Sequence, residues 1–161
     1  MLTIFAPLSG TVVAMSDVDD PVFAAGYVGP GVAIDPVVPR GQDAGAGFGL
    51  TGDVLAPITG RVAKLHPHAF VIEHGEGRGV LVHLGIDTVE LRGAGFVLLA
   101  AEGDDVVAGQ ALIRWDPGGV AAGGRSPVCP VVALGAAPDA ITVMDQPGTP
   151  VAAGMPLLTW T

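Results

Sequence analysis

Glycine and proline interrupt this chain so often that no long regular element fits between them. The 161 residues include 25 glycines and 14 prolines, scattered without the strict triplet period of collagen. Short runs of valine, isoleucine and leucine lie between these breaks, and no segment keeps a helical stripe of apolar residues for three turns. The pattern predicts an all-β fold with little helix, built as a compact antiparallel β-sandwich or flattened barrel.

Two strand-turn motifs each occur twice in the sequence. APLSGTVVAM at positions 6–15 resembles APITGRVAKL at 56–65, and GDDVVAGQALI at 103–113 resembles GTPVAAGMPLL at 148–158. The shared glycines suit tight turns, and the shared valine and leucine suit buried anchor positions. We therefore expect the same turns to be built twice within a single domain that spans residues 1–161. The glycine-rich segment 40–52 between the repeats is predicted to be a surface loop, because it carries no phosphate-binding motif.

The composition excludes several classes of protein. Half of the residues are hydrophobic, which argues against a disordered chain, and the net charge of −9 opposes binding to nucleic acid. No apolar run approaches the roughly 18 residues of a membrane span, and the start lacks the features of a signal peptide. We therefore expect a cytoplasmic protein without stable membrane insertion, and a monomer. Cys129 is the single cysteine, so no intramolecular disulfide can form.

Four histidines cluster in the sequence, and two of them are candidates for chemistry. His66, His68, His74 and His83 fall in a segment that reads as a β-hairpin, HAFVIEH and GVLVHLGI around a glycine-rich turn. A two-residue turn at 76–77 would place Phe70 opposite His83. On that register His68, Phe70 and His83 share one face, and the rings of His68 and His83 converge.

The alternation of side chains along the second strand of this hairpin, GVLVHLGI, predicts which way His83 points. Val80 and Val82 would face the core, so Leu81 and His83 would face the other side, in a partly exposed apolar surface shared with Phe70. Such a surface suits a partner protein.

A histidine in a strand is more often a hydrogen-bonded structural residue, and His74 beside the turn fits that description. For His83, the carbonyl of Gly85 could accept a hydrogen bond from Nδ1, which would leave Nε2 free as a nucleophile or a metal ligand. Asp87 could add a nearby negative charge or simply form a turn.

VHLGIDTVEL at 82–91 is preceded by HPHAFVIE at 66–73 and followed by GAGF at 93–96. In sequence and in order, these segments resemble the glucose-family enzyme IIA of the bacterial phosphoenolpyruvate-dependent sugar phosphotransferase system. The resemblance extends to IFAPLSGTVV, to DDPVFAAGYVGPGVAI at 19–34, to VLAPITGRVAKL and to EGDDVVAGQALI, and therefore covers nearly the whole chain. A short motif becomes specific when its expected context is present.

The resemblance implies an antiparallel β-sandwich that takes a phosphoryl group from the phosphocarrier protein HPr and passes it to an enzyme IIB domain for sugar uptake and phosphorylation. By motif position, His83 corresponds to the histidine phosphorylated at Nε2, and His68 to the second histidine, which assists transfer. Asp20 and Asp87 fall where the family has acidic residues that face HPr.

The predicted site includes further residues around the two histidines. We assign Phe23, Phe70 and Leu81 to the partner surface, and Gly85 to the support of His83. His66 stands where family members can carry threonine, so an imidazole would replace a hydroxyl at that position or the hydrogen bond would be lost. No cofactor is required, although a zinc ion could bind between His68 and His83.

Two other functions compete with this interpretation. His66, His68 and His83 could supply three nitrogens to the zinc ion of a hydrolase, with an open fourth position for water. The β-rich zinc peptidases that this suggests need a later H-x-H motif, and no histidine follows His83. A regulatory or carrier module on the same scaffold is the second alternative. A lipoyl or biotinyl domain would need a lysine at a hairpin tip in a Met-Lys context, which Lys64 lacks.

Overall fold

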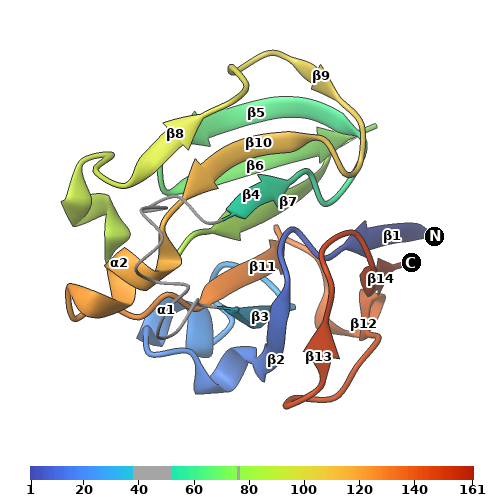
Figure 1. Cartoon of the computed structure of the whole chain (residues 1–161). Helices are drawn as coiled ribbons and strands as arrows, with labels where there is room; N and C mark the ends of the chain where they lie inside the picture. Colours follow the sequence, from blue (N-terminus) through green and yellow to red (C-terminus); the bar gives the residue numbers. More distant parts are fainter. Residues whose placement is uncertain (38–51, 76) are drawn as a thin grey trace.

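The structure is a computed structural model that describes residues 1–37, 52–75 and 77–161. Every strand pair within these ranges is antiparallel. The strands form an eight-stranded sheet in the order β13-β2-β3-β11-β7-β6-β5-β9 and two three-stranded sheets, β1-β14-β12 and β4-β10-β8 (Figure 1). The predicted antiparallel β-sandwich is confirmed. The predicted loop at 40–52 lies outside the described residues, apart from Gly52.

Short elements dominate, as the density of glycine and proline predicts. The strands are β1 (Leu2–Phe5), β2 (Gly10–Ala14), β3 (Gly31–Pro36), β4 (Gly52–Leu55), β5 (Gly60–His66), β6 (Ala69–His74), β7 (Arg78–His83), β8 (Phe96–Leu98), β9 (Asp105–Val106), β10 (Ala111–Trp115), β11 (Cys129–Ala133), β12 (Ile141–Val143), β13 (Pro150–Val151) and β14 (Pro156–Trp160). The helices are α1 (Pro21–Ala24), α2 (Pro117–Ala122) and the 3-10 turns η1 (Met15–Asp17), η2 (Thr88–Leu91) and η3 (Pro138–Ala140).

The two repeated motifs occupy equivalent places in the two halves of the fold. Gly10 begins β2 and pairs with Val151 of β13, while Gly60 begins β5 and pairs with Val106 of β9. A Cβ atom on either glycine would collide with a backbone carbonyl of the adjacent strand, so only glycine fits at these positions. The expectation that the same turns are built twice is confirmed.

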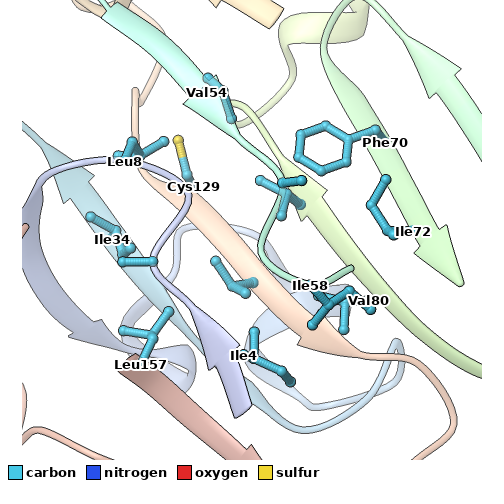
Figure 2. Packing of buried hydrophobic residues seen from close by; sticks show 14 of the residues in the cluster. Ile4, Leu8, Ile34, Val54, Ile58, Phe70, Ile72, Val80, Cys129 and Leu157 are labelled. Carbon is cyan, nitrogen blue, oxygen red and sulfur yellow. The ribbon is translucent and has the colours of Figure 1, made fainter. Parts of the chain in front are cut away.

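The larger of two hydrophobic clusters among the described residues forms the core between the sheets. It is made mostly of buried aliphatic side chains from both repeated halves, with Phe70 at 0% exposed (Figure 2), and it also contains Trp115 and Trp160. Figure 1 shows the two ends of the chain close together on one side of the molecule and α1 and α2 on the opposite side. No helix among the described residues is long and apolar enough to cross a membrane.

Cys129 lies inside this core and provides a direct check on the packing. Its thiol is 0% exposed and donates to the carbonyl of Pro127 at 3.2 Å, and burial raises the pKa of the thiol to about 12. Because only the thiolate reacts, we expect thiol-disulfide reagents at about pH 8 to modify the native protein about 1,000-fold more slowly than the urea-unfolded chain. Reaction of the native protein at the unfolded rate would contradict this placement of Cys129.

Candidate functional site

Three of the four histidines converge at one end of the β5-β6-β7 arrangement. His66 ends β5, His68 lies in the turn before β6, and His83 ends β7. The ring centroids of His68 and His83 are 5.3 Å apart in an edge-to-face arrangement, and His66 stacks on His68 at 5.7 Å. His74 lies at the far end of β6, where its Nδ1 is 2.7 Å from the carbonyl oxygen of Thr59. The structural role predicted for His74 is thereby supported.

The hairpin that carries these residues has a different register from the predicted one. His74 pairs with Arg78, so the turn holds three residues instead of two, and Ala69 lies opposite His83. Phe70 therefore pairs with Val82 and points into the core. The prediction that Phe70 shares a face with His83 was wrong, because a slip of one residue moves every side chain to the other face of the sheet. Phe70 is consequently removed from the partner surface.

The two rings nevertheless meet, since His68 reaches His83 from a turn rather than from a paired strand. The backbone N–H of Leu84, directly after His83, donates to the carbonyl of His68 at 2.7 Å. This bond ties the turn that carries His68 to the end of β7. The predicted convergence of His68 and His83 is correct, although the register from which it was inferred was not.

A hydrogen bond to the backbone fixes the tautomer of His83. Its Nδ1 lies 2.6 Å from the carbonyl oxygen of Gly85, and a carbonyl can only accept, so Nδ1 carries the proton. The lone pair is therefore on Nε2. Gly85 has a φ of +79°, in the left-handed region, which turns its carbonyl back toward the ring. The predicted contact between Gly85 and His83 is confirmed.

Burial favours the neutral form of His83 and of His68. Desolvation lowers the pKa of His83, while the Gly85 carbonyl and the carboxylates of Asp20 and Asp87 oppose that shift. Desolvation also lowers the pKa of His68, and the neighbouring His83 and His66 act in the same direction. Both rings are therefore in the neutral form that can attack as a nucleophile or donate a single N–H.

The lowered pKa values predict a specific pH dependence. A proton-nitrogen NMR titration should give midpoints for His83 and His68 below 6.5, the ordinary value for histidine. The same protein unfolded in urea serves as the control, and its histidines should titrate near 6.5. A midpoint above 6.5 for His83 would mean that the charges of Asp20 and Asp87 outweigh desolvation, and would contradict the arrangement described.

Helix α1 forms one wall of the site. Asp20 caps it, since Oδ1 accepts from the backbone N–H groups of Val22 at 2.9 Å and Phe23 at 3.4 Å. The capped helix directs Phe23 edge-on to His83, with ring centroids 5.4 Å apart. Phe23 is only 8% exposed and belongs to a small apolar cluster with which Leu81 also packs. Leu81 shares a face with His83, as predicted, but it is partly buried against this cluster.

Two exposed apolar side chains on the border of the site were missed by the sequence analysis. Val22 on α1 is 49% exposed, and Val89 on η2 is 59% exposed. A signal for the first was present, because an aspartate followed by proline, Asp20-Pro21, is a typical helix start. No comparable signal marked Val89, which follows Asp87 in a turn with φ of +59°.

The described residues offer no complete metal centre. Within residues 1–37, 52–75 and 77–161, no group of three or more histidine, cysteine, aspartate or glutamate side chains could hold a metal ion. Three nitrogens from His66, His68 and His83 are the minimum that the zinc hydrolase hypothesis requires. That hypothesis has no support from the geometry of the site.

Known proteins resemble this chain over most of its length. Residues 2–137 match the sequence model of a family described as phosphoenolpyruvate-dependent sugar phosphotransferase system, EIIA 1. A glucose-specific EIIA component of Staphylococcus aureus is 35% identical over 133 residues, which cover 81% of this chain and 72% of that protein. A second glucose-specific EIIA component, from Halalkalibacterium halodurans, is 39% identical over 131 residues, which cover 80% of this chain and 68% of that protein.

A solved structure shares the fold over nearly the whole length of both chains. Glucose permease IIA from Mycoplasma capricolum superposes with a TM-score of 0.79 at 29% sequence identity, covering 98% of this chain and 94% of that chain.

Proposed function

Because the chain belongs to the EIIA 1 family of the phosphoenolpyruvate-dependent sugar phosphotransferase system, we propose that His83 is the residue on which it carries the phosphoryl group. As a member of this family, the protein accepts a phosphoryl group from HPr and passes it to an enzyme IIB domain of a sugar permease. The observation that carries the proposal is the hydrogen bond from Nδ1 of His83 to Gly85, which leaves Nε2 as the free nucleophile beside His68.

The chemistry balances without a further reactant. The lone pair on Nε2 of His83 attacks the phosphorus of phospho-HPr, a new N–P bond forms, and the bond to HPr breaks with its electron pair returning to HPr. Since Nδ1 keeps its proton, the ring of His83 gains positive charge as the bond forms. The Gly85 carbonyl and the carboxylates of Asp20 and Asp87 stabilise that charge. Transfer to enzyme IIB follows the same steps with the roles exchanged.

We assign two supporting roles to the other imidazoles. His68, edge-on to His83, would donate an N–H to the oxygens of the transferring phosphoryl group and so stabilise its charge. His66 stacks on the far side of His68, so we propose that it orients His68. His68 and His83 together supply only two nitrogens, fewer than zinc sites use, and the transfer we propose runs through no metal.

The partner surface follows from exposure and charge. We propose that Val22 and Val89, the exposed apolar side chains on α1 and η2, contact HPr and enzyme IIB. Phe23 and Leu81 would support this surface from below, because both are largely covered. Asp20 and Asp87 place negative charge beside His83 and would attract a basic surface on the partner. These partners act in the cytoplasm, so we propose that location for this protein.

A phosphorylation assay tests the proposed function. The purified protein is incubated with radiolabelled phosphoenolpyruvate, enzyme I and HPr, and the label is followed on the chain. We expect incorporation close to one phosphoryl group per chain, dependent on HPr, with the label lost in acid and retained in base. No labelling in the complete mixture, or labelling that survives acid, would contradict phosphohistidine chemistry.

A further inference from the structure

The loop that follows His83 is closed by one buried hydroxyl group. Thr88 is 0% exposed, and among the described residues no other polar or charged side chain is buried. Its Oγ1 donates to the carbonyl of Leu84 at 2.7 Å, across the four-residue span that contains Gly85. A buried hydroxyl without a partner is costly, so this bond strongly selects the closed form of the loop.

Leu84 connects this bond to His68 and to His83, which directly precedes it in the chain. Its carbonyl accepts from Thr88, while its N–H donates to the carbonyl of His68 at 2.7 Å. The opposite side of the loop is held by a second bond, from the N–H of Ile86 to the carbonyl of Ser126 at 2.9 Å. Hydrogen bonds to Thr88, His68 and Ser126 thus fix the backbone that presents the Gly85 carbonyl to His83.

The loop needs such support because its backbone conformation is unfavourable. Gly85 has a φ of +79°, and Asp87, which has a side chain, has a φ of +59°. A left-handed conformation is unfavourable for a residue with a Cβ atom, and it persists only when the surroundings impose it. The methyl group of Thr88 also packs against Gly85, since a Cβ atom on Gly85 would lie 2.7 Å from Cγ2 of Thr88.

We infer that Thr88 is a positioning residue for phosphoryl transfer, and that its hydroxyl holds the 84–88 loop so that the Gly85 carbonyl keeps the proton of His83 on Nδ1. Thr88 does not contact the phosphoryl group; it acts through Leu84 and Gly85. When the Thr88 hydroxyl is removed, the Gly85 carbonyl is no longer held against Nδ1 of His83. The ring then also adopts the tautomer in which Nε2 carries the proton and cannot attack.

Two substitutions separate the hydroxyl from the shape of the side chain. Thr88→Val keeps the volume and removes the hydroxyl, whereas Thr88→Ser keeps the hydroxyl and removes the methyl group. Nitrogen NMR of the unphosphorylated protein reports the tautomer of His83 directly. We expect a single Nδ1–H tautomer in the wild type and in Thr88→Ser, and a mixture in Thr88→Val. The exposed Thr11 of β2 provides the matched control, Thr11→Val, with an unchanged tautomer.

The rate of phosphoryl transfer gives an independent readout that rests on the proposed function. With saturating phospho-HPr, we expect Thr88→Val to accept the phosphoryl group about 10-fold more slowly and Thr88→Ser to remain within about 2-fold of the wild type. The tautomer of His83 can be measured without any partner protein. If the protein did not accept a phosphoryl group from HPr, there would be no transfer rates to compare, but the NMR result would still test the role of Thr88.

The outcomes that overturn the inference are equally defined. A folded Thr88→Val protein with the wild-type tautomer and rate would show that the hydroxyl positions nothing. If Thr88→Val does not fold, Thr88→Ser decides, because a folded serine variant that has lost the single Nδ1–H tautomer would also refute the role of the hydroxyl. If Thr88→Ser retains the single Nδ1–H tautomer and transfers the phosphoryl group at a rate near that of the wild type, the role of the hydroxyl is supported.

Discussion

His83→Ala is expected to abolish labelling from phosphoenolpyruvate, enzyme I and HPr, with no detectable phosphoryl group on the chain. His83 is the histidine of the site whose tautomer a backbone bond fixes among the described residues, through Nδ1 to Gly85 at 2.6 Å, which leaves the lone pair on Nε2. Removal of an attacking nucleophile cannot be compensated by residues that only orient or stabilise charge. The measurement is the label retained by the chain after separation from HPr.

A matched variant shows whether the effect belongs to the site. His74→Ala removes a histidine from the far end of β6, where the ring contacts Thr59, and should be labelled as the wild type is. Circular dichroism and thermal unfolding verify that both variants are folded. Persistent acid-labile label on a folded His83→Ala protein would show that another residue carries the phosphoryl group.

His68→Gln is expected to accept the phosphoryl group and to pass it on poorly. During acceptance, the group arrives already held by HPr, whereas during donation the site must itself orient it for enzyme IIB. The imidazole of His68, 5.3 Å from that of His83, is the group placed to do so. Loss of one such donor typically costs about 100-fold to 1,000-fold in rate. We expect a loss of that size in sugar phosphorylation and a change of less than about 10-fold in acceptance.

The control for this prediction is His66→Gln, which changes the ring stacked on the other side of His68. If His66 only orients His68, its effect on sugar phosphorylation should be smaller than that of His68→Gln. Sugar phosphorylation at the wild-type rate by His68→Gln, with an enzyme IIB domain that accepts from the wild type, would exclude His68 as the transfer partner.

The sequence was most informative where chemistry and local geometry coincide. The spacing of His83 and Gly85 was enough to predict the bond between Nδ1 and the carbonyl, because both groups lie within one turn of backbone. The alternation of Val80, Val82 and Leu81 correctly predicted which face of β7 is buried. The repeated glycines correctly predicted equivalent turns in the two halves, since close backbone approach restricts the residue type.

Prediction failed where a long-range register or a packing partner decided the outcome. One additional residue in the turn between β6 and β7 moved Phe70 from the expected partner surface into the core. The burial of Phe23 on α1, edge-on to His83 and in one apolar cluster with Leu81, depends on contacts between segments far apart in the sequence. Pattern and periodicity describe single segments, and neither contains this information.

The site also contains a residue that the sequence motif alone could not interpret. Thr88 belongs to the VHLGIDTVEL segment, yet its role depends on complete burial and on the bond to Leu84. A threonine beside aspartate in a turn is equally compatible with an exposed cap. Only the folded structure distinguishes these two roles.

The measurement that tests the central claim most directly is the identification of the phosphorylated atom in the wild-type protein. After phosphorylation by enzyme I and HPr, phosphorus and nitrogen NMR at alkaline pH can assign the new N–P bond to one nitrogen of one histidine. We predict a single phosphohistidine at Nε2 of His83, with the proton retained on Nδ1 against Gly85. A phosphoryl group on Nδ1 of His83, or on His68 or His66, would contradict the account.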